Sequence, residues 1–527
     1  MRDFQRPGRS VVYAARGMAA TSHPFASLAA VDILRRGGNA VDAAIAACAV
    51  QCVVEPQSTG IGGDCFALFA PASGPVVALN GSGWAPAALS LERLRALGIS
   101  ALTADSVHSI TVPGAVAAWE MLQRAHGRLD LGAVLEAAIS YAEEGFPVLP
   151  RVAFDWKQAE ARLRGREATR RLYLPSGSAP RAGCVLRYPA LARTLRRIAK
   201  EGAKVFYEGE LAAWMIETLR AAGGLHELSD FAAYEPAWVE PIHGDYRGVR
   251  VFECPPNGQG FVPLLMLHLL EGFVLADLDP DGAERYHLEA EATKLAFSER
   301  DAWLADPRAG ALPLGQVLQK SHAEELRRWI DPKRARFDLP APCRAGGDTV
   351  YIAVVDGEGN ACSFINSLYD GFGSALVCPR TGVLFHCRGR AFSLDPDHPN
   401  ALAPRKRPMH TIIPALAFRG ERLFACFGVM GADFQPVGQV HLLTNLIDYA
   451  MDPQTALDHP RAMAYPRDLQ LERGIRPEVA ERLRAMGHPV TAAATPLGGG
   501  QCILLDHERG LLIGGSDPRK DGIALGF

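Results

Sequence analysis

The chain has 527 residues, of which 48% are hydrophobic and 21% charged, a composition typical of a folded globular protein and unlike that of a disordered or collagen-like one. The 55 Lys and Arg residues nearly balance the 58 Asp and Glu residues, so the formal net charge is only −3. Because this charge is too small to attract nucleic acid or anionic lipid, we expect neither as a partner and favour a small-molecule substrate.

Two helices are predicted near the start of the chain. Ser22 can cap the first helix, which Gly37-Gly38 would end. Asn39 can cap the second, which is apolar on nearly every side as far as Pro56 and therefore fits a helix enclosed by other elements. The glycine-rich loop at residues 59–64 lacks the Lys-Ser/Thr of a nucleotide-binding loop. We therefore expect its glycines to allow close packing of the backbone.

The rest of the chain divides into a helical part and a part rich in strands. Residues 91–339 are predicted to be mainly helical, and residues 331–347, which are rich in proline and charge, to form an exposed linker. Directly after the linker, residues 349–368 predict a β-hairpin with its turn at 357–360. A second hairpin is predicted over residues 501–515. The length of the chain allows two to four domains or one large α/β unit.

The cysteines and the first residues indicate a cytoplasmic protein. Eleven dispersed cysteines suggest reduced, buried thiols and no disulfide framework. Residues 1–9 are polar and lack the apolar region of a signal peptide. The longest apolar stretch, 40–54, is shorter than the roughly 20 residues that cross a bilayer.

No metal or cofactor is expected. The sequence has no Gly-x-Ser-x-Gly, His-Glu-x-x-His or Cys-x-x-Cys motif. Cys48 and Cys52 share a face of the apolar helix, where core packing is a better explanation than zinc binding. His386 and Cys387 are adjacent and cannot easily share one ion.

The junction of Asp348 and Thr349 is the place in the sequence where a catalytic residue can be proposed. A linker running into a strand that begins with a hydroxyl residue suits an N-terminal nucleophile, provided that the chain is cut between these two residues. The new α-amine, with a pKa of roughly 7.7 to 8.0, could then take the proton of its own hydroxyl. Taken alone, the pattern is more often that of an ordinary threonine at the start of a strand.

Blocks of sequence along almost the whole chain resemble the γ-glutamyltransferase family, in the family's order. They are Gly17–Pro24, Gly37–Ala44, Val54–Pro56, Gly60–Gly63, Thr111–Ala115, Glu291–Ala296, Arg300–Asp301, Arg405–Pro408 and Gly515–Arg519. The resemblance implies an α+β fold, the four-layer αββα sandwich of the N-terminal-nucleophile hydrolases. It also implies one precursor that cuts itself into a large subunit, residues 1–348, and a small subunit, residues 349–527, with Thr349 as the nucleophile.

The resemblance assigns further positions near the nucleophile. The backbone amides of the oxyanion hole fall at Gly431 and Ala432. Alanine replaces a glycine of the family at position 432, but it keeps the N–H that such a hole needs. The family's second hydroxyl falls at Ser367, which could hydrogen-bond the hydroxyl or amine of Thr349. An ordinary strand serine is the alternative there.

The positions with which the family grips a γ-glutamyl group are almost all changed. The arginine falls at Ser82, the asparagine at Tyr369, the acidic residue at Ala391 and the serine pair at His410-Thr411. Without a carboxylate, the ammonium of a glutamyl donor would be buried unpaired, at a cost of several kcal/mol. A glutamyl substrate is therefore a poor fit.

Arg388 suggests a different substrate. Its guanidinium could clamp a small carboxylate, although an exposed or ion-paired arginine is the alternative. The blocks Phe4–Ser10, Gly60–Asp64, Asn80–Gly83, Ser367–Asp370, Phe372–Ser374, Arg388–Gly389, His410–Pro414 and Val429–Gly431 resemble the oxamate amidohydrolase branch of the family. Trp84 departs from that branch, where an arginine is expected.

The sequence thus predicts a self-cleaving amidohydrolase that converts a small amide such as oxamate to oxalate and ammonia through an acyl-threonine. Arg388, Tyr369, His410 and Thr411 would bind the substrate. The subunits come from one precursor, and the αβ unit could form homo-oligomers. Two alternatives stay open: a γ-glutamyltransferase or glutathione hydrolase, and an uncleaved relative that acts only as a binding protein.

Overall fold

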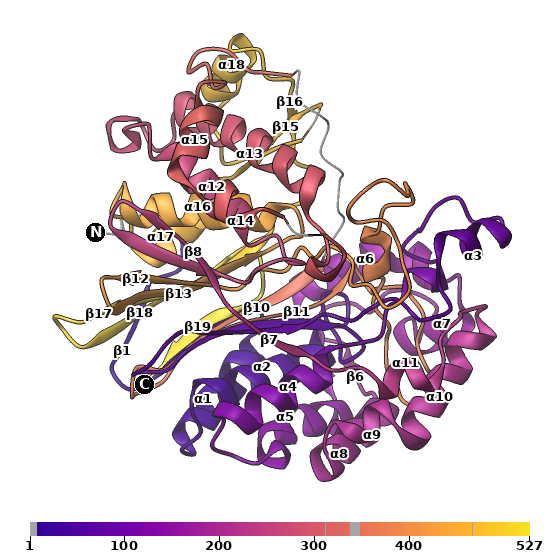
Figure 1. The fold of residues 1–527 in the computed structure, drawn as a ribbon. Helices are drawn as coiled ribbons and strands as arrows, with labels where there is room; N and C mark the ends of the chain where they lie inside the picture. Colours follow the sequence, from indigo (N-terminus) through magenta and orange to yellow (C-terminus); the bar gives the residue numbers. More distant parts are fainter. Residues whose placement is uncertain (1–7, 311, 338–347, 466) are drawn as a thin grey trace.

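The computed structural model describes residues 8–310, 312–337, 348–465 and 467–527. Two seven-stranded sheets, antiparallel throughout, lie between two layers of helices (Figure 1). The first sheet has the strand order β1 (Val12–Ala14), β18 (Leu511–Ser516), β17 (Gly499–Asp506), β13 (Arg422–Met430), β12 (Ala415–Arg419), β9 (Val249–Glu253), β8 (Ile242–Tyr246). The second has the order β19 (Ile523–Gly526), β2 (Met18–Thr21), β10 (Asp348–Val355), β11 (Ala361–Tyr369), β3 (Asp64–Ala70), β4 (Val77–Gly81), β7 (Ala237–Val239).

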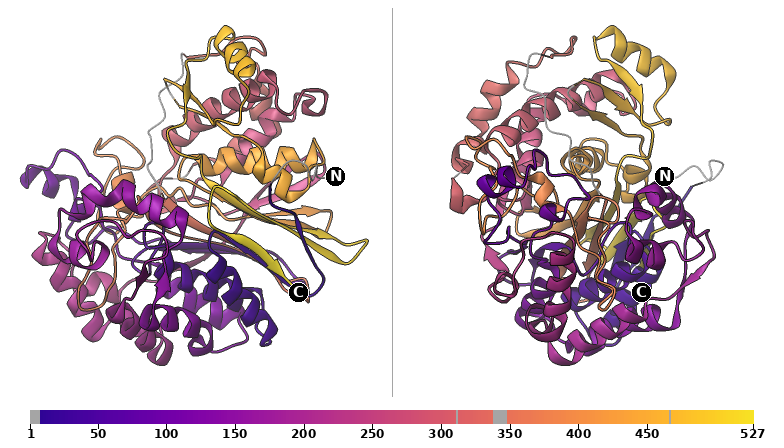
Figure 2. Two further views of the ribbon diagram at one scale, coloured as in Figure 1. Left: turned by 180° about the vertical axis from the view of Figure 1, so that it is seen from behind. Right: turned by 90° about the vertical axis from the view of Figure 1, so that its right-hand side faces the viewer.

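One helical layer packs on the outer face of the second sheet and the other on the outer face of the first (Figure 2). The layer on the second sheet includes α1 (Pro24–Arg35), α2 (Ala40–Val54), α4 (Ala115–His126), α5 (Leu131–Glu144) and α8 (Pro189–Glu201). The layer on the first sheet includes α12 (Phe261–Leu270), α13 (Ala283–Trp303), α16 (Phe434–Ile447) and α17 (Pro453–Asp458). This is the αββα sandwich that the sequence predicts, and the prediction is confirmed.

Smaller elements connect and extend these layers. The helices are α3 (Leu91–Ala96), α6 (Pro150–Leu163), α7 (Glu167–Tyr173), α9 (Lys204–Tyr207), α10 (Gly209–Ala221), α11 (Leu228–Ala232), α14 (Leu314–Val317), α15 (Lys320–Arg327) and α18 (Pro477–Ala485). The 3-10 turns are η1 (Val107–Ser109), η2 (Leu275–Asp277), η3 (Pro307–Ala309) and η4 (Arg388–Ala391). The short strands β5 (Phe146–Pro147) and β6 (Val185–Leu186) pair, as do β14 (Ala462–Ala464), β15 (Leu469–Leu471) and β16 (Val490–Ala492).

The two sheets pack closely because small residues lie where they meet. Both sheets contribute apolar side chains to a shared core that includes Phe66, Tyr351 and Ile503. A Cβ on Gly428 of β13 would lie only 2.4 Å from the ring of Tyr351 on β10, closer than atoms can approach. Glycine is therefore required for β13 to pass this near β10.

Most local predictions hold, and the exceptions have physical reasons. Asn39 caps α2 and every residue of that helix is buried, as predicted. The cap of α1 is His23 instead of Ser22, because the His23 ring accepts the Phe25 amide while the Ser22 hydroxyl donates to Glu55 at 2.7 Å. Both predicted hairpins are present as β10–β11 and β17–β18.

Two broader expectations need correction. The segment predicted to be mainly helical also contains β7, β8 and β9, which complete the edges of the two sheets. Of the ten described cysteines, nine are buried but Cys184 is exposed, so not every thiol belongs to the core. Cys343 and most of the expected linker, residues 338–347, lie outside the described residues.

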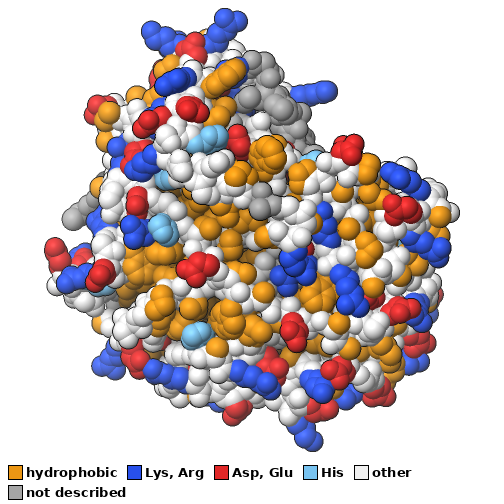
Figure 3. Space-filling model, in the orientation of Figure 1, with side chains coloured by type: hydrophobic (Ala, Val, Ile, Leu, Met, Phe, Trp, Pro, Cys, Tyr) orange, Lys and Arg blue, Asp and Glu red, His pale blue; other side chains and the backbone are white. Residues whose placement is uncertain are grey.

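None of the helices described by the structure is long and apolar enough to cross a membrane. On the face shown in Figure 3, positively and negatively charged side chains are interspersed with hydrophobic ones.

Candidate active site

Thr349 lies at the start of β10, in a hairpin irregularity that sets its side chain beside Ser367. Asp348 pairs with Tyr369 and Val350 pairs with Asn366, so two residues of β11 lie opposite Thr349 alone. Such a bulge redirects a side chain out of the regular ladder. The Thr349 and Ser367 hydroxyls are 3.1 Å apart and both residues are buried. The structure thus brings together the two hydroxyls that the sequence singles out.

The glycine-rich loop before β3 packs against this hairpin. A Cβ on Gly63 would lie 2.3 Å from the Ser367 carbonyl oxygen, and one on Gly62 would lie 2.2 Å from the Leu384 carbonyl oxygen. Only glycine fits at either position. The prediction of close backbone packing is confirmed, and the loop fixes β3 beside β11.

Tyr369 links the hydroxyl pair to Arg388. The Tyr369 amide donates to the Ser367 hydroxyl at 2.9 Å, and the guanidinium of Arg388 lies 4.0 Å from the centre of the Tyr369 ring. Tyr369 has a φ of 81°, a conformation that is uncommon for a bulky residue and is often found at functional sites.

Arg388 is a buried cation whose donors are only partly used. Its Nη1 donates to the Thr411 hydroxyl at 3.0 Å. Within the described chain, Nε and Nη2 have no hydrogen-bond partner, and no carboxylate forms an ion pair with Arg388. Burial lowers the pKa of this guanidinium. Since Arg388 is 1% exposed, the structure excludes the alternative of a solvated arginine and leaves two N–H groups free to bind an anion.

His410 and His386 lie against one buried carboxylate, Asp64 at the start of β3. His410 Nε2 is 3.0 Å from Asp64 Oδ2, while His386 Nδ1 is 3.4 Å from the same oxygen but outside hydrogen-bonding geometry. Burial lowers the pKa of His410 to about 3, so this imidazole is neutral near pH 7 and its Nε2–H donates to Asp64. Burial opposes ionisation of Asp64, yet its two histidine neighbours keep the pKa of its carboxyl well below the usual range.

The predicted oxyanion residues form a tight turn between β13 and α16. Gly431 has a φ of 119° and Ala432 a φ of 47°, so the alanine adopts the left-handed conformation. Among the described residues, neither backbone N–H donates a hydrogen bond. Two adjacent unsatisfied amides are the donors that an oxyanion hole requires.

Gln259 connects this turn to the segment that contains Thr411. Its side-chain amide donates to the Thr411 carbonyl at 2.8 Å and to the Ala432 carbonyl at 3.1 Å. Arg300 donates to the Gln259 side-chain oxygen at 3.0 Å and pairs with Asp433 at 2.6 Å. Thr411, which accepts from Arg388, and the turn at Gly431 and Ala432 are therefore connected through one buried glutamine.

The other positions that the sequence singles out lie at the edge of this cluster. The Ser82 hydroxyl donates to Asn80 at 2.7 Å. Trp84 packs edge-on against Tyr234, with ring centres 5.1 Å apart. The guanidinium groups of Arg308 and Arg407 flank the Trp84 ring. Ala391 ends η4, which begins with Arg388.

Sequence reasoning missed Asp64, His386 and Gln259. A charged residue at the head of the otherwise apolar strand Asp64–Ala70 was a usable signal for Asp64, because a buried carboxylate needs partners. Gln259 gave no such signal, since its importance comes from contacts with residues more than 150 positions away.

One group of side chains has the donors for a metal ion. The nearest ligand atoms of His287, Glu291 and His488 lie within 4.8 Å of one another. However, His287 Nδ1 and His488 Nε2 already share a hydrogen bond of 2.7 Å, and Glu291 pairs with Lys294. These groups are satisfied without an ion, and the absence of a metal remains a prediction.

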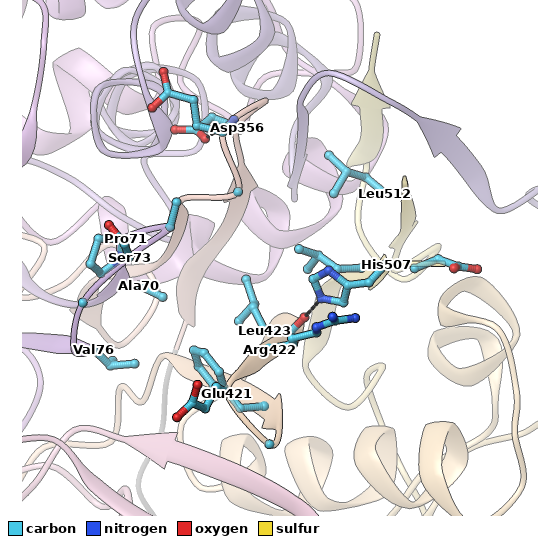
Figure 4. A pocket seen from close by; sticks show the side chains of 18 of the residues that line it. Ala70, Pro71, Ser73, Val76, Asp356, Glu421, Arg422, Leu423, His507 and Leu512 are labelled. Atoms are coloured by element: carbon cyan, nitrogen blue, oxygen red, sulfur yellow. Dashed lines mark hydrogen bonds between the residues drawn. The ribbon is translucent and has the colours of Figure 1, made fainter. Parts of the chain in front are cut away.

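Cavities lie both at the site and away from it. One of about 830 Å³ opens between the ends of the two sheets, where His507 donates to the Leu423 carbonyl and Asp356 and Pro71 form the opposite wall (Figure 4). It contains none of the candidate catalytic residues. Another cavity, of about 370 Å³, is lined by Gly431 and Gly371 and therefore opens at the turn between β13 and α16.

The fold and this cluster define an N-terminal-nucleophile amidohydrolase. Residues 26–527 match the family described as gamma-glutamyltranspeptidase, and the chain belongs to that family. The glutathione hydrolase-like YwrD proenzyme of Bacillus subtilis (strain 168) is 38% identical, and the match covers 98% of this chain and 99% of that protein. The oxamate amidohydrolase proenzyme of Klebsiella pneumoniae subsp. pneumoniae is 36% identical, with 97% and 98% covered.

The solved structures agree with this assignment. The crystal structure of cephalosporin acylase from Bacillus halodurans matches with a TM-score of 0.93 and 41% identity, covering 100% of this chain and 99% of that one. Because its relatives are proenzymes, the chain is a self-processing amidohydrolase that yields two subunits from one precursor.

Proposed function

We propose that the protein hydrolyses a short amide whose acyl half carries a carboxylate, such as oxamate. In this proposal, cleavage between Asp348 and Thr349 frees the α-amine of Thr349, which becomes the nucleophile. The amides of Gly431 and Ala432 hold the oxyanion, and Ser367 positions the Thr349 hydroxyl through the contact of 3.1 Å. Arg388, Tyr369, His410 and Thr411 form the pocket for the acyl half.

The observation that supports the proposal most strongly is the buried environment of Arg388 and its unused hydrogen-bond donors. A guanidinium buried against an aromatic ring, with two unpartnered N–H groups in the described structure, is costly unless an anion binds there. A carboxylate one bond from the scissile carbonyl would pair with it in bidentate fashion. Oxamate has that carboxylate and carries no ammonium.

The chemistry balances with water as the only co-reactant. The Thr349 hydroxyl oxygen attacks the amide carbon, and its proton passes to the Thr349 α-amine. The α-amine then returns the proton to the leaving nitrogen, so that ammonia departs and an oxalyl ester remains on Thr349. Water attacks this ester, its proton returns to the threonine oxygen, and oxalate leaves.

The carboxylates near the site argue against a γ-glutamyl donor. Asp64 accepts from His410 at 3.0 Å, Asp370 from Arg390 at 2.6 Å and Asp433 from Arg300 at 2.6 Å. Each of these groups already has a cationic or N–H partner, so none is available to a substrate ammonium without breaking a buried contact.

A denaturing gel tests whether the protein is processed. The wild-type protein should give two fragments that meet at Asp348/Thr349, and Thr349→Ala should give a single band. A single band for freshly purified wild-type protein would support the uncleaved binding protein instead.

Substrate assays test the acyl half. Wild-type protein should release ammonia from oxamate, and Arg388→Met should lower kcat/KM by about 100-fold or more, as expected for a lost charge-assisted pair of about 3 kcal/mol. The matched control Arg390→Met, which removes a half-exposed neighbour, should retain most of the activity. Strong turnover of a γ-glutamyl anilide together with inert oxamate would refute the proposal in favour of a γ-glutamyl hydrolase.

A further inference from the structure

Gln259 lies in the loop between β9 and α12 and is completely buried. Its backbone N–H donates to the His410 carbonyl at 3.0 Å, and the neighbouring Gly258 forms an isolated β-bridge with His410. The backbone of residues 258–259 therefore holds the segment that contains His410 and Thr411, two residues of the proposed acyl pocket.

The side chain of Gln259 contacts two segments at once. Its Nε2 donates to the Thr411 carbonyl at 2.8 Å and to the Ala432 carbonyl at 3.1 Å. An amide nitrogen has two N–H groups, so each carbonyl can receive one of them. The acyl pocket and the turn at Ala432 are thus held at a fixed separation by one side chain.

Arg300 determines which end of the Gln259 amide faces these carbonyls. A guanidinium donates hydrogen bonds and accepts none, so the Gln259 atom 3.0 Å from Arg300 Nη1 must be the oxygen. The amide nitrogen must then point toward Thr411 and Ala432. Arg300 also forms an ion pair of 2.6 Å with Asp433, the residue after Ala432, so the orienting cation is attached to the same turn.

Both carbonyls belong to residues whose positions matter for the proposed chemistry. The Thr411 hydroxyl accepts from Arg388 at 3.0 Å, so a shift of Thr411 would move a partner of Arg388. Ala432 has a φ of 47°, a conformation that is uncommon for alanine and persists where surrounding contacts hold it. A displacement of about 1 Å at an active site can cost about 100-fold in rate.

We propose that Gln259 is a positioning residue for both halves of the site, with its amide oriented by Arg300. Without touching the substrate, it keeps Thr411 within reach of Arg388 and keeps Ala432 in the conformation of the oxyanion hole. The inference rests on the proposed function, because it takes Arg388 as the site of the acyl carboxylate and Ala432 as an oxyanion donor.

Gln259→Met tests the proposal, since methionine has a similar length but no amide. The kcat for oxamate should fall by about 10- to 100-fold, because the oxyanion turn loses a contact that holds it. The inhibition constant of oxalate, the product expected in the acyl pocket, should rise by about three- to ten-fold, as for one weakened hydrogen bond. Gln259→Glu has the shape of glutamine but turns an oxygen toward the two carbonyl oxygens, and it should lower kcat at least as much.

Gln439→Met is the matched control. Gln439 is also completely buried, and its Nε2 donates to the Ile413 carbonyl at 2.8 Å. This variant should keep both constants within about two-fold of wild type. Thermal unfolding compares the stability of all three variants. A residue that only fills space would tolerate Gln259→Glu as well as the control is tolerated.

A double variant separates the two roles of Gln259. In an Arg388→Met background, the position of Thr411 no longer affects the binding of oxalate. Adding Gln259→Met should therefore leave the inhibition constant of oxalate unchanged and still lower kcat. An equal further rise of the inhibition constant would show that Gln259 does not act through Arg388, which would overturn the proposal for the acyl pocket.

The outcomes separate this inference from the proposed function. If wild-type protein hydrolyses oxamate but the Gln259 variants resemble Gln439→Met, the positioning role is wrong and the acyl assignment stands. Failure of both Gln259 variants to fold, with a folded control, would assign Gln259 to the stability of the fold and overturn the positioning role. If fully processed wild-type protein does not hydrolyse oxamate, the acyl assignment is wrong and this inference is overturned with it.

Discussion

Ala432 shows how a single residue carries strain at the proposed oxyanion hole. With a φ of 47° it adopts a left-handed conformation that costs an alanine roughly 1 kcal/mol and glycine almost nothing. The geometry of the turn is set by Gly431 and by the hydrogen bond from Gln259 to the Ala432 carbonyl. The methyl group of Ala432 is thus tolerated there and does not shape the turn.

Ala432→Gly should therefore raise the free energy of unfolding slightly, by up to about 1 kcal/mol, and leave kcat within about two-fold of wild type. The gain is limited because glycine also adds entropy to the unfolded chain. Thermal unfolding and an amide hydrolysis assay check both parts. A loss of ten-fold or more in kcat would mean that the Cβ itself positions the amide.

Sequence reasoning reached those site residues that a local pattern or the family resemblance marks. Thr349 and Ser367 belong to one hairpin, so their proximity follows from the turn between them. Asp64 lies beside Ser367 through the pairing of β3 with β11, although the two residues are 303 positions apart in the chain. A local pattern of apolar residues does not determine this strand pairing. The partners of Asp64 could therefore be identified only from the fold.

Among the elements, α6 has a specific role through Arg162. This side chain donates to the carbonyls of Gly371 and Gly373, in a loop where Tyr369, Phe372 and Gly373 all have positive φ values. A loop of such uncommon conformations keeps its shape only if surrounding contacts hold it. Arg162 is therefore a positioning residue for Tyr369 and, through that ring, for Arg388.

Arg162→Met should lower the free energy of unfolding by about 2 kcal/mol, because it removes two charge-assisted hydrogen bonds to carbonyl groups. It should also raise KM for oxamate more than it lowers kcat. The matched control is Arg164→Met, which removes only an exposed ion pair with Glu160 and should change stability by less than about 0.5 kcal/mol. Equal effects of the two variants would rule out the positioning role.

The N-terminus of α1 should respond to pH through its cap. Burial lowers the pKa of His23 to about 3, from an ordinary value of 6.5. Between these values the unfolded chain binds a proton that the folded chain excludes. The free energy of unfolding therefore falls as the pH drops below 6.5, by at most about 1.4 kcal/mol per pH unit from this group.

His23→Asn keeps an oxygen acceptor for the Phe25 amide and removes the titrating ring. The variant should be less stable than wild type at pH 7, because it leaves a small cavity, but the difference should shrink as the pH is lowered to 5. Urea unfolding at pH 7, 6 and 5 measures it. Parallel pH dependences of the two proteins would contradict the assignment, since the other buried histidines are common to both.

Elements were predictable where the local pattern was long and regular. The helix Ala40–Val54 and the hairpin Asp348–Tyr369 have strong apolar patterns and clear ends. The strands β7, β8 and β9 are three to five residues long and lie inside a largely helical region. They are strands because β4 and β12 offer free edges for pairing, which is a tertiary cause.

At the scale of the whole molecule, the proposed cleavage divides the chain into two polypeptides, but the strands of the two polypeptides remain paired in the same sheets. Both sheets contain strands from residues 1–348 and from residues 349–527. Five strand pairs join the two segments: β1–β18, β9–β12, β2–β10, β2–β19 and β3–β11. Neither segment alone completes either of the two seven-stranded sheets, so we propose that they are interleaved subunits and not independent domains.

The two fragments should therefore remain associated after processing. Gel filtration of processed protein in 1 M NaCl should give one peak that contains both polypeptides, at the same elution volume as uncleaved Thr349→Ala. High salt should not separate them, because the shared core between the sheets is apolar and salt weakens only exposed charge pairs. The fragments should separate only in denaturant, together with the loss of activity. Separate peaks under native conditions would mean that the strand pairs across Thr349 do not hold the subunits together.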